Sequence, residues 1–179
     1  MSYRKYTHLD PLPTTFDTSS TLPEGTNPDG KSLANDQTRA SQSPWYENYD
    51  QPFLADGSRS DNVFDFHIYY SLGSKTQVEH AKKLHERIRR EFPEFRIYKF
   101  WDRAVGPHPI AMFEVNVFTP VQVGALLGFL VAYRGPLSVL MRTYRIHPNT
   151  SDALRDHTER ATWMGTPIPL ITEFLEVDH

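Results

Sequence analysis

The stretch from residue 62 onward shows two hydrophobic periodicities in a fixed order, and this order constrains the fold more than any other feature of the chain. Residues 62–70 alternate apolar and polar side chains, which predicts a half-buried strand with His67 and Tyr69 on its polar face. Residues 75–92 then place apolar side chains at spacings of three and four, which predicts an amphipathic helix. The folded part therefore begins with a strand followed by a helix.

The later patterns complete a ferredoxin-like arrangement. Further strands are expected at 95–101, 111–118 and 137–146, and a second helix at 120–133. The order strand, helix, strand, strand, helix, strand is that of the split βαβ fold. We expect an α+β domain of this type, with an antiparallel sheet in the order 4-1-3-2 and both helices on one face. An extra C-terminal helix is predicted near 151–163, followed by extended segments at 165–171 and 174–177.

Residues 1–60 have a different composition from the rest of the chain. Pro, Gly, Ser, Thr, Asn and Asp fill 33 of these 60 positions, and Ile and Val are absent. Such a segment buries too little apolar area to offset the entropy lost on ordering. We predict an N-terminal extension at 1–60 and a folded domain at 61–179. The extension is expected to be mostly disordered, or to dock onto the folded domain as an arm through its aromatic residues near 45–54.

Composition excludes several classes of protein. The formal net charge of -3 argues against a strongly basic nucleic-acid-binding protein. The absence of Cys excludes a disulfide framework, an iron–sulfur cluster and a thiol nucleophile. No run of about 18 apolar residues is present, so no membrane span is expected. The first ten residues lack the apolar core of a secretory signal, and we expect a cytoplasmic protein.

Histidines are the residues that carry candidate chemistry. His67 and Glu114 are predicted on the polar faces of two neighbouring central strands, where they can share a metal ion or a proton, or form an ordinary cross-strand pair. His108 lies between two prolines in the sequence Gly-Pro-His-Pro, and this stiff loop suits a ligand whose position must be fixed. Taken alone, each of these histidines also fits a structural role.

Two more histidines follow in the C-terminal part. His147 opens the sequence His-Pro-Asn-Thr after the last predicted strand, and His157 lies on the less polar side of the predicted third helix. The imidazoles of His67, His108 and His147, or two of them with Glu114, are enough to hold Fe(II) or Zn. The spacing of these residues does not choose the metal.

The motifs that carry these residues, taken together, resemble the small DOPA 4,5-dioxygenase family. The resemblance covers about residues 62–171. The matching segments are Phe-His-Ile-Tyr at 66–69, Asp-Arg-Ala-Val-Gly-Pro-His-Pro at 102–109, Ser-Val-Leu at 138–140, His-Pro-Asn-Thr at 147–150, Asp-His-Thr at 156–158, Trp-Met-Gly at 163–165 and Pro-Ile-Pro-Leu at 167–170.

The resemblance implies a fold, an activity and a set of site residues. The fold would be ferredoxin-like, of the dimeric α/β-barrel type, and the partners would be a second copy of the chain, a catechol and dioxygen. The activity would be extradiol cleavage of a catechol such as L-DOPA, giving a seco-DOPA that cyclises to a betalamic-type pigment. A non-haem metal would be held by His67, His108 and His147, with His157 nearby as acid–base or supporting residue. Fe(II) is the favoured metal, and Zn or Cu are alternatives.

Charged and aromatic residues near these motifs suit the substrate. Arg103 or Arg142 can pair with the carboxylate of an amino-acid catechol, and Tyr69 and Trp101 can flank its ring. Two other functions fit the same residues. One is a metal-dependent enzyme of the same fold that acts on another phenol, and the other is a dimeric binding module without catalysis.

Overall fold

The computed structural model describes residues 21–35, 64–143 and 153–175. The chain divides into two units, Met1–Pro44 and Trp45–His179. In the described part of the first unit, Thr26 and Leu33 form an isolated antiparallel bridge, and no residue of 21–35 belongs to a helix or a longer strand. The rest of the predicted extension lies outside the described residues, and the predicted division at residue 60 stays a prediction.

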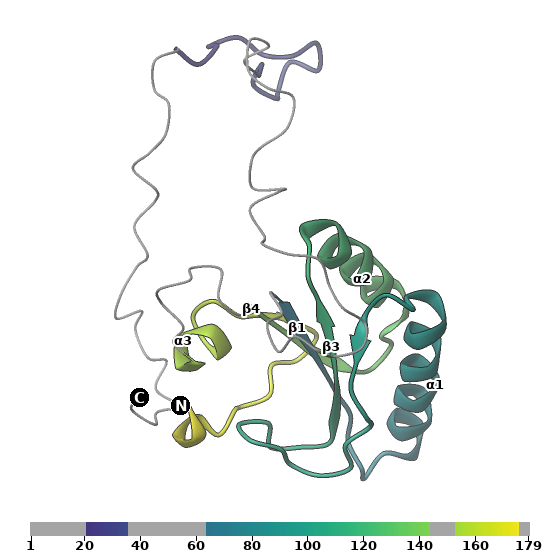
Figure 1. Cartoon of the computed structure of the whole chain (residues 1–179). Helices are drawn as coiled ribbons and strands as arrows, with labels where there is room; N and C mark the ends of the chain where they lie inside the picture. Colours follow the sequence, from purple (N-terminus) through teal and green to yellow (C-terminus); the bar gives the residue numbers. More distant parts are fainter. Residues whose placement is uncertain (1–20, 36–63, 144–152, 176–179) are drawn as a thin grey trace. The chain divides into compact units, whose positions relative to one another are not determined.

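The second unit is built on a five-stranded antiparallel sheet (Figure 1). Its strands are β1 (Phe64–Tyr69), β2 (Arg96–Ile97), β3 (Met112–Val117), β4 (Ser138–Thr143) and β5 (Thr162–Met164). They lie in the order β2-β3-β1-β4-β5. The α+β class and the predicted order of the first four strands are therefore confirmed, and β5 extends the sheet beyond β4.

Two helices cover one face of this sheet and a short helix lies on the other side (Figure 1). The covering helices are α1 (Lys75–Glu91) and α2 (Pro120–Tyr133), and the short helix is α3 (Ala153–His157). Among the described residues, no helix combines the length and the apolar character needed to cross a membrane.

Both long helices begin at the residues that the sequence predicts. The Ser74 hydroxyl accepts a hydrogen bond from the Gln77 amide at 3.3 Å, which caps α1. The Thr119 hydroxyl caps α2 in the same way through the Gln122 amide at 3.2 Å. Pro120 occupies the first turn of α2, where its missing N–H costs no helical hydrogen bond.

The main hydrophobic core lies between these helices and the sheet. Alternate residues of β1 and β3 point into it, and α1 and α2 contribute their buried stripes. The fully buried members include Phe66, Ile68, Ala81, Ile88, Phe113, Val115, Val117, Leu126, Leu130 and Val139. Period-two alternation sends the polar residues of the central strands to the opposite face.

That opposite face is covered by the chain's own loops and C-terminal segment. Tyr69, Met112 and Leu140 form a second, smaller apolar cluster there. The partly buried residues packed against it come from the loop before β3 and from residues 161–170: Trp101, Val105, Ile110, Ala161, Trp163, Ile168 and Leu170. The polar residues of β1, β3 and β4 are thus enclosed rather than exposed on a wet sheet surface.

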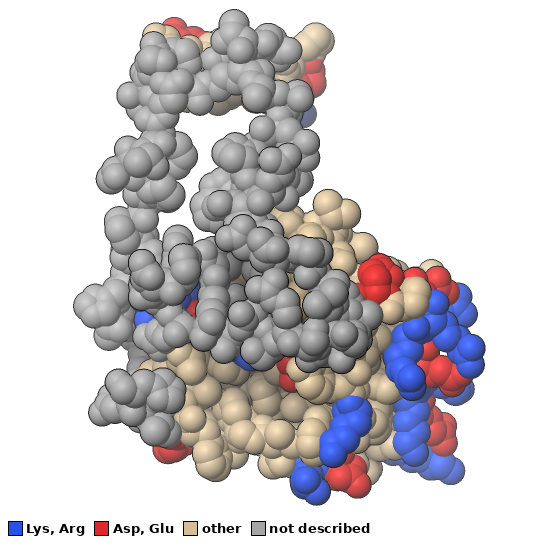
Figure 2. Space-filling view, in the orientation of Figure 1, with Lys and Arg blue, Asp and Glu red and all other residues tan. Residues whose placement is uncertain are grey.

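The outer surface of α1 carries opposite charges one helical turn apart. Arg87 pairs with Glu91 at 2.7 Å, and Arg90 pairs with Glu86 at 2.6 Å. Figure 2 shows Lys, Arg, Asp and Glu gathered over this helix at the right of the view. These pairs are exposed, so water and salt screen them and they add little to the free energy of unfolding.

The C-terminal region differs from the sequence expectation. The predicted helix at 151–163 is wrong in its length, because α3 ends at His157 and β5 follows at Thr162–Met164. Pairing of β5 with β4 explains the difference, because it supplies backbone hydrogen bonds that a local pattern does not reveal. The predicted extended end is also wrong in part, because a 3₁₀ helix occupies Thr172–Phe174.

Gly135, which follows α2, offers a test of this packing. Its φ is +55°, and an added Cβ would lie 2.8 Å from the Nε2 atom of His80. That nitrogen is hydrogen-bonded to the Tyr133 carbonyl at 3.0 Å. We expect Gly135→Ala to lower the free energy of unfolding by about 1–2 kcal/mol, because an L residue is strained at this φ.

Urea denaturation measures this loss, and Gly128→Ala is the matched control. Gly128 lies inside α2 with no atom within 4 Å of an added Cβ. Its replacement should raise the free energy of unfolding by about 0.5–1 kcal/mol, because Ala loses less entropy than Gly in a helix. Equal shifts for the two variants would contradict the assigned conformation of Gly135.

Candidate metal centre

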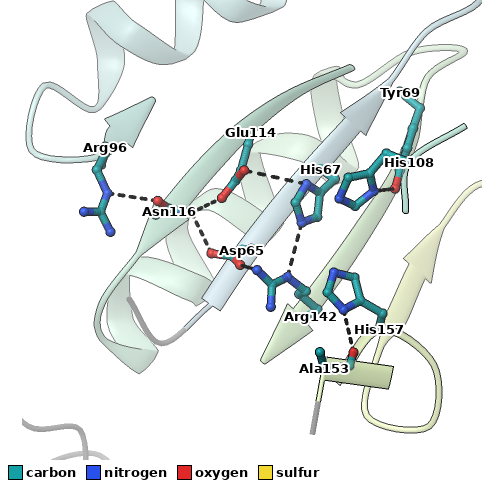
Figure 3. Close-up of polar contacts among 10 residues, drawn as sticks. All are labelled: Asp65, His67, Tyr69, Arg96, His108, Glu114, Asn116, Arg142, Ala153 and His157. Atoms are coloured by element: carbon teal, nitrogen blue, oxygen red, sulfur yellow. Dashed lines mark hydrogen bonds and ion pairs between the residues drawn. The ribbon is translucent and has the colours of Figure 1, made fainter. Parts of the chain in front are cut away.

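Three histidines from distant parts of the chain meet on the enclosed face of the sheet (Figure 3). His67 comes from β1, His108 from the loop before β3, and His157 from the end of α3. One ring nitrogen of each lies within 4.8 Å of a ring nitrogen of the other two. The ring centroids are 4.1 Å apart for His67 and His108, and 5.8 Å apart for His108 and His157. All three side chains are buried.

A tight turn positions His108. Val105 and His108 exchange two backbone hydrogen bonds of 3.0 Å, and Gly106 between them has a φ of +54°. The Pro107 carbonyl accepts a hydrogen bond from the Ile171 amide at 2.9 Å, which ties the loop to the C-terminal segment. The flanking prolines are expected to make this loop rigid, and the hydrogen bond between Ile171 and Pro107 restrains it further.

The imidazole of His108 is also held by a hydroxyl. Its Nδ1 atom lies 2.6 Å from the hydroxyl oxygen of Tyr69, and both side chains are buried. The Tyr69 ring stacks on Trp163 with centroids 5.5 Å apart. Tyr69 is only 1% exposed, so its ring is packed inside the protein rather than presented on a surface.

His157 is oriented by its own helix. Its Nδ1 atom lies 2.6 Å from the Ala153 carbonyl oxygen, one turn earlier in α3. A carbonyl only accepts, so Nδ1 carries the proton and donates, and Nε2 keeps its lone pair. The helix packs against β4, and an ion pair of 2.9 Å between Arg160 and Asp156 links α3 to the turn that follows.

His67 has one engaged and one unengaged nitrogen. Its Nε2 atom accepts a hydrogen bond from Arg142 Nε at 3.4 Å. Its Nδ1 atom is buried and has no hydrogen-bond partner among the described residues. Oε2 of Glu114 lies 4.0 Å from this Nδ1 atom. His67 and Glu114 are opposite each other in the β1–β3 register, as the sequence predicts.

A buried network of charges adjoins His67. Arg142 forms an ion pair with Asp65, and the two residues face each other in the β1–β4 register. The Asn116 amide donates to Asp65 at 2.6 Å and to Glu114 at 2.7 Å. Arg96 donates to the Asn116 carbonyl oxygen at 2.9 Å. Burial raises the pKa of Asp65 to about 7, while the Arg142 guanidinium acts in the opposite direction.

The same burial keeps the histidines neutral. It lowers the pKa of His108 to about 3, with the neighbouring His157 and Arg142 adding to the effect. Burial, and then Arg142, lower the pKa of His157 to about 4. The pKa of His67 falls well below its usual range for the same first cause. Neutral imidazole is the form that binds transition metals, so the cluster can hold a divalent ion without first losing protons.

The other predicted site residues are distributed as follows. Arg142 lies beside the cluster, whereas Arg103 is exposed with its guanidinium 5.4 Å from the centre of the Trp101 ring. His147 lies outside the described residues, so its predicted role as a ligand stays a prediction. A second set of candidate ligands, Asp65, His67 and Glu114, also has atoms within 4.8 Å of one another.

Three supporting contacts were not expected from the sequence. They are the Asp65–Arg142 ion pair, the stacking of Trp163 on Tyr69 and the Ala153 carbonyl bound to His157. The ion pair follows from the β1–β4 register, which alternation alone does not determine.

Comparison with known proteins agrees with this geometry. The model of the Dopa 4,5-dioxygenase family matches residues 64–174, which contain all three clustered histidines. The chain belongs to this family. The name of the family indicates a dioxygenase, that is, an enzyme that uses O₂ and a small-molecule substrate.

Individual relatives of this Dopa 4,5-dioxygenase family member support the assignment. A DOPA 4,5-dioxygenase of Amanita muscaria is 31% identical over 110 residues, which cover 59% of this chain and 46% of the relative. An uncharacterized 21.2 kDa protein of Botryotinia fuckeliana is 48% identical over 172 residues, or 92% of this chain and 88% of the relative. A crystal structure from Nostoc punctiforme, of a protein assigned provisionally as a dioxygenase, matches with a TM-score of 0.54 and 29% identity over 64% of this chain and 90% of that chain.

Proposed function

We propose that this protein is an extradiol dioxygenase that opens the ring of a catechol such as L-DOPA at a histidine-bound non-haem metal. The observation that carries the proposal is the meeting of three buried, neutral imidazoles on one enclosed face. The net reaction adds both atoms of O₂ across a ring carbon–carbon bond next to the diol, so no external reductant is required. The product from L-DOPA would be a seco-DOPA that cyclises to a betalamic-type compound.

The donor set fits a transition metal that accepts nitrogen ligands. His67 and His108 are the first two proposed ligands, and geometry favours His157 as the third because its Nε2 lone pair is uncommitted in the described structure. Fe(II) is the proposed ion, and Zn or Cu would accept the same imidazoles. When bound, such an ion lowers the pKa of the catechol hydroxyls and supplies a position for O₂.

Arg142 is the proposed anchor for the substrate's carboxylate. Its ion pair with Asp65 fixes the guanidinium next to His67, and a guanidinium has five N–H donors that can serve more than one acceptor. Arg103 is the second candidate for this contact. Trp101 belongs to the apolar cluster on the same face, where it can pack on a ring and exclude water.

Replacement of His157 should affect metal content differently according to whether the residue acts as an acid–base group or as a metal ligand. A residue that only accepts the catechol proton and later returns it leaves metal content unchanged when it is replaced. A ligand's replacement removes metal. Metal analysis of His157→Ala therefore separates the two roles.

The decisive functional test is anaerobic loading of the purified full chain with Fe(II), followed by L-DOPA and then air. We expect oxygen uptake together with a yellow product. Simple catechols and monophenols, assayed in parallel, separate ring cleavage of L-DOPA from activity on another phenol. The absence of oxygen uptake with every catechol, at confirmed metal occupancy, would contradict the proposal and favour a non-catalytic binding module. The predicted homodimer is measured on the same sample by sedimentation.

A further inference from the structure

Each of the three clustered histidines has its Nδ1 side next to a different group of the protein (Figure 3). Nδ1 of His108 lies 2.6 Å from the Tyr69 hydroxyl. Nδ1 of His157 lies 2.6 Å from the Ala153 carbonyl oxygen. Nδ1 of His67 lies 4.0 Å from a carboxylate oxygen of Glu114. Three unrelated elements thus provide an oxygen on the same side of each ring.

The hydrogen bonds determine which nitrogen of two rings carries the proton. The Ala153 carbonyl can only accept, so His157 holds its proton on Nδ1. The Nε2 atom of His67 accepts from Arg142, so a neutral His67 also holds its proton on Nδ1. That buried proton has no acceptor in the described structure, and Oε2 of Glu114, 4.0 Å from Nδ1, lies beyond hydrogen-bond range.

The contact of His108 with Tyr69 occupies Nδ1 and leaves Nε2 as the nitrogen that can bind a metal. A hydroxyl can donate or accept, so this hydrogen bond does not assign the proton in the metal-free protein. The hydroxyl nevertheless blocks Nδ1 at 2.6 Å, and Nε2 is the nitrogen that remains for another ligand. An ion bound at Nε2 would require the proton on Nδ1, where the Tyr69 oxygen accepts it.

We propose that Tyr69, Glu114 and the Ala153 carbonyl are positioning groups that hold His108, His67 and His157 so that all three present Nε2 to the metal, which would replace the long 3.4 Å contact from Arg142 Nε at His67 Nε2. This inference rests on the metal site of the proposed function and adds how that site is oriented. Glu114 would complete its contact by a small movement toward His67, giving a carboxylate–histidine–metal arrangement. Tyr69 then orients His108 instead of flanking the substrate ring.

Nitrogen NMR of ¹⁵N-histidine-labelled full chain tests the assignment in two states. In the metal-free protein, we expect His67 and His157 to be protonated on Nδ1. In the zinc-loaded protein, we expect all three rings to carry a slowly exchanging proton on Nδ1 and to bind zinc through Nε2. A ring bound through Nδ1, or a metal-free His157 protonated on Nε2, would overturn the inference.

Zinc affinity, measured by competition with a chelator, tests the two side chains. Tyr69→Phe and Glu114→Gln should each weaken binding by about 10- to 100-fold, because supporting partners of metal-bound histidines have effects of this size. Tyr133→Phe removes an exposed tyrosine hydroxyl elsewhere and is the matched control. The His108 signal of Tyr69→Phe should also lose its protected Nδ1 proton, which a purely structural role would not change.

The outcomes separate this inference from the function on which it rests. Failure of the wild type to bind zinc, cobalt or iron would contradict the metal site itself, and the inference with it. Tight binding by the wild type, with unchanged affinity and unchanged His108 signals in Tyr69→Phe, would overturn only the positioning role. Circular dichroism of each variant confirms that the fold is retained.

Discussion

His108→Ala is expected to remove bound metal and to lower kcat/KM for catechol cleavage by about 10³-fold or more. The proposed ion would contribute several kcal/mol by stabilising charge on the substrate oxygens, and His108 is the proposed ligand whose ring lies closer to that of His67, with centroids 4.1 Å apart. Metal content per chain and oxygen uptake measure the two effects. His67→Ala should behave in the same way, because one lost imidazole leaves too few nitrogens for tight binding.

His85→Ala is the matched control for these variants. His85 lies on α1, where its ring packs against Phe113 of the helix-covered core, on the opposite side of the sheet. It should retain both metal and activity. Loss of metal from His157→Ala but not from His147→Ala would support the third ligand that the geometry favours, and the reverse would support the ligand implied by the family resemblance. Full metal content and activity in His108→Ala would contradict the proposed centre.

Arg142→Met is expected to lower the free energy of unfolding by about 3 kcal/mol, because it removes the guanidinium that forms an ion pair with the buried Asp65 carboxylate. Chemical denaturation at neutral pH measures the change. The double variant Asp65→Asn/Arg142→Met should be more stable than Arg142→Met alone, because it removes both charges together. Arg142→Met should also raise KM for an amino-acid catechol more than for catechol itself.

An exposed ion pair provides the control for the stability loss expected from breaking the buried Asp65–Arg142 pair. Arg87 and Glu91 are 2.7 Å apart, with side chains 66% and 44% exposed. Arg87→Met should change the free energy of unfolding by less than about 0.5 kcal/mol, because water screens such pairs. Equal losses for Arg87→Met and Arg142→Met would contradict the assigned burial of the Asp65–Arg142 pair.

The sequence predicts the central part of the fold because its periodicities are long and uninterrupted. Six alternating residues in β1 and in β3 place His67 and Glu114 on the same face, and antiparallel pairing puts them opposite each other. The capping residues Ser74 and Thr119 mark the starts of both long helices. These features are local, so a single sequence contains the information that specifies them.

The C-terminal half of the site depends on contacts that no local pattern encodes. β5 has three residues and exists because it pairs with β4, so residues 158–163 could be mistaken for a continuation of α3. In this short helix, a ring nitrogen of His157 lies within 4.8 Å of ring nitrogens of His67 and His108. The sequence alone predicts His157 only near the metal, as an acid–base or supporting residue. The Asp65–Arg142 pair likewise depends on the β1–β4 register.

Anomalous diffraction from crystals of the iron-loaded full chain, recorded at the iron absorption edge, tests the central claim most directly. We expect one strong peak per chain, about 2.1 Å from a ring nitrogen of each of His67, His108 and His157. An ordered iron peak away from these three imidazoles, in a chain that shows ring-cleaving activity, would contradict the account.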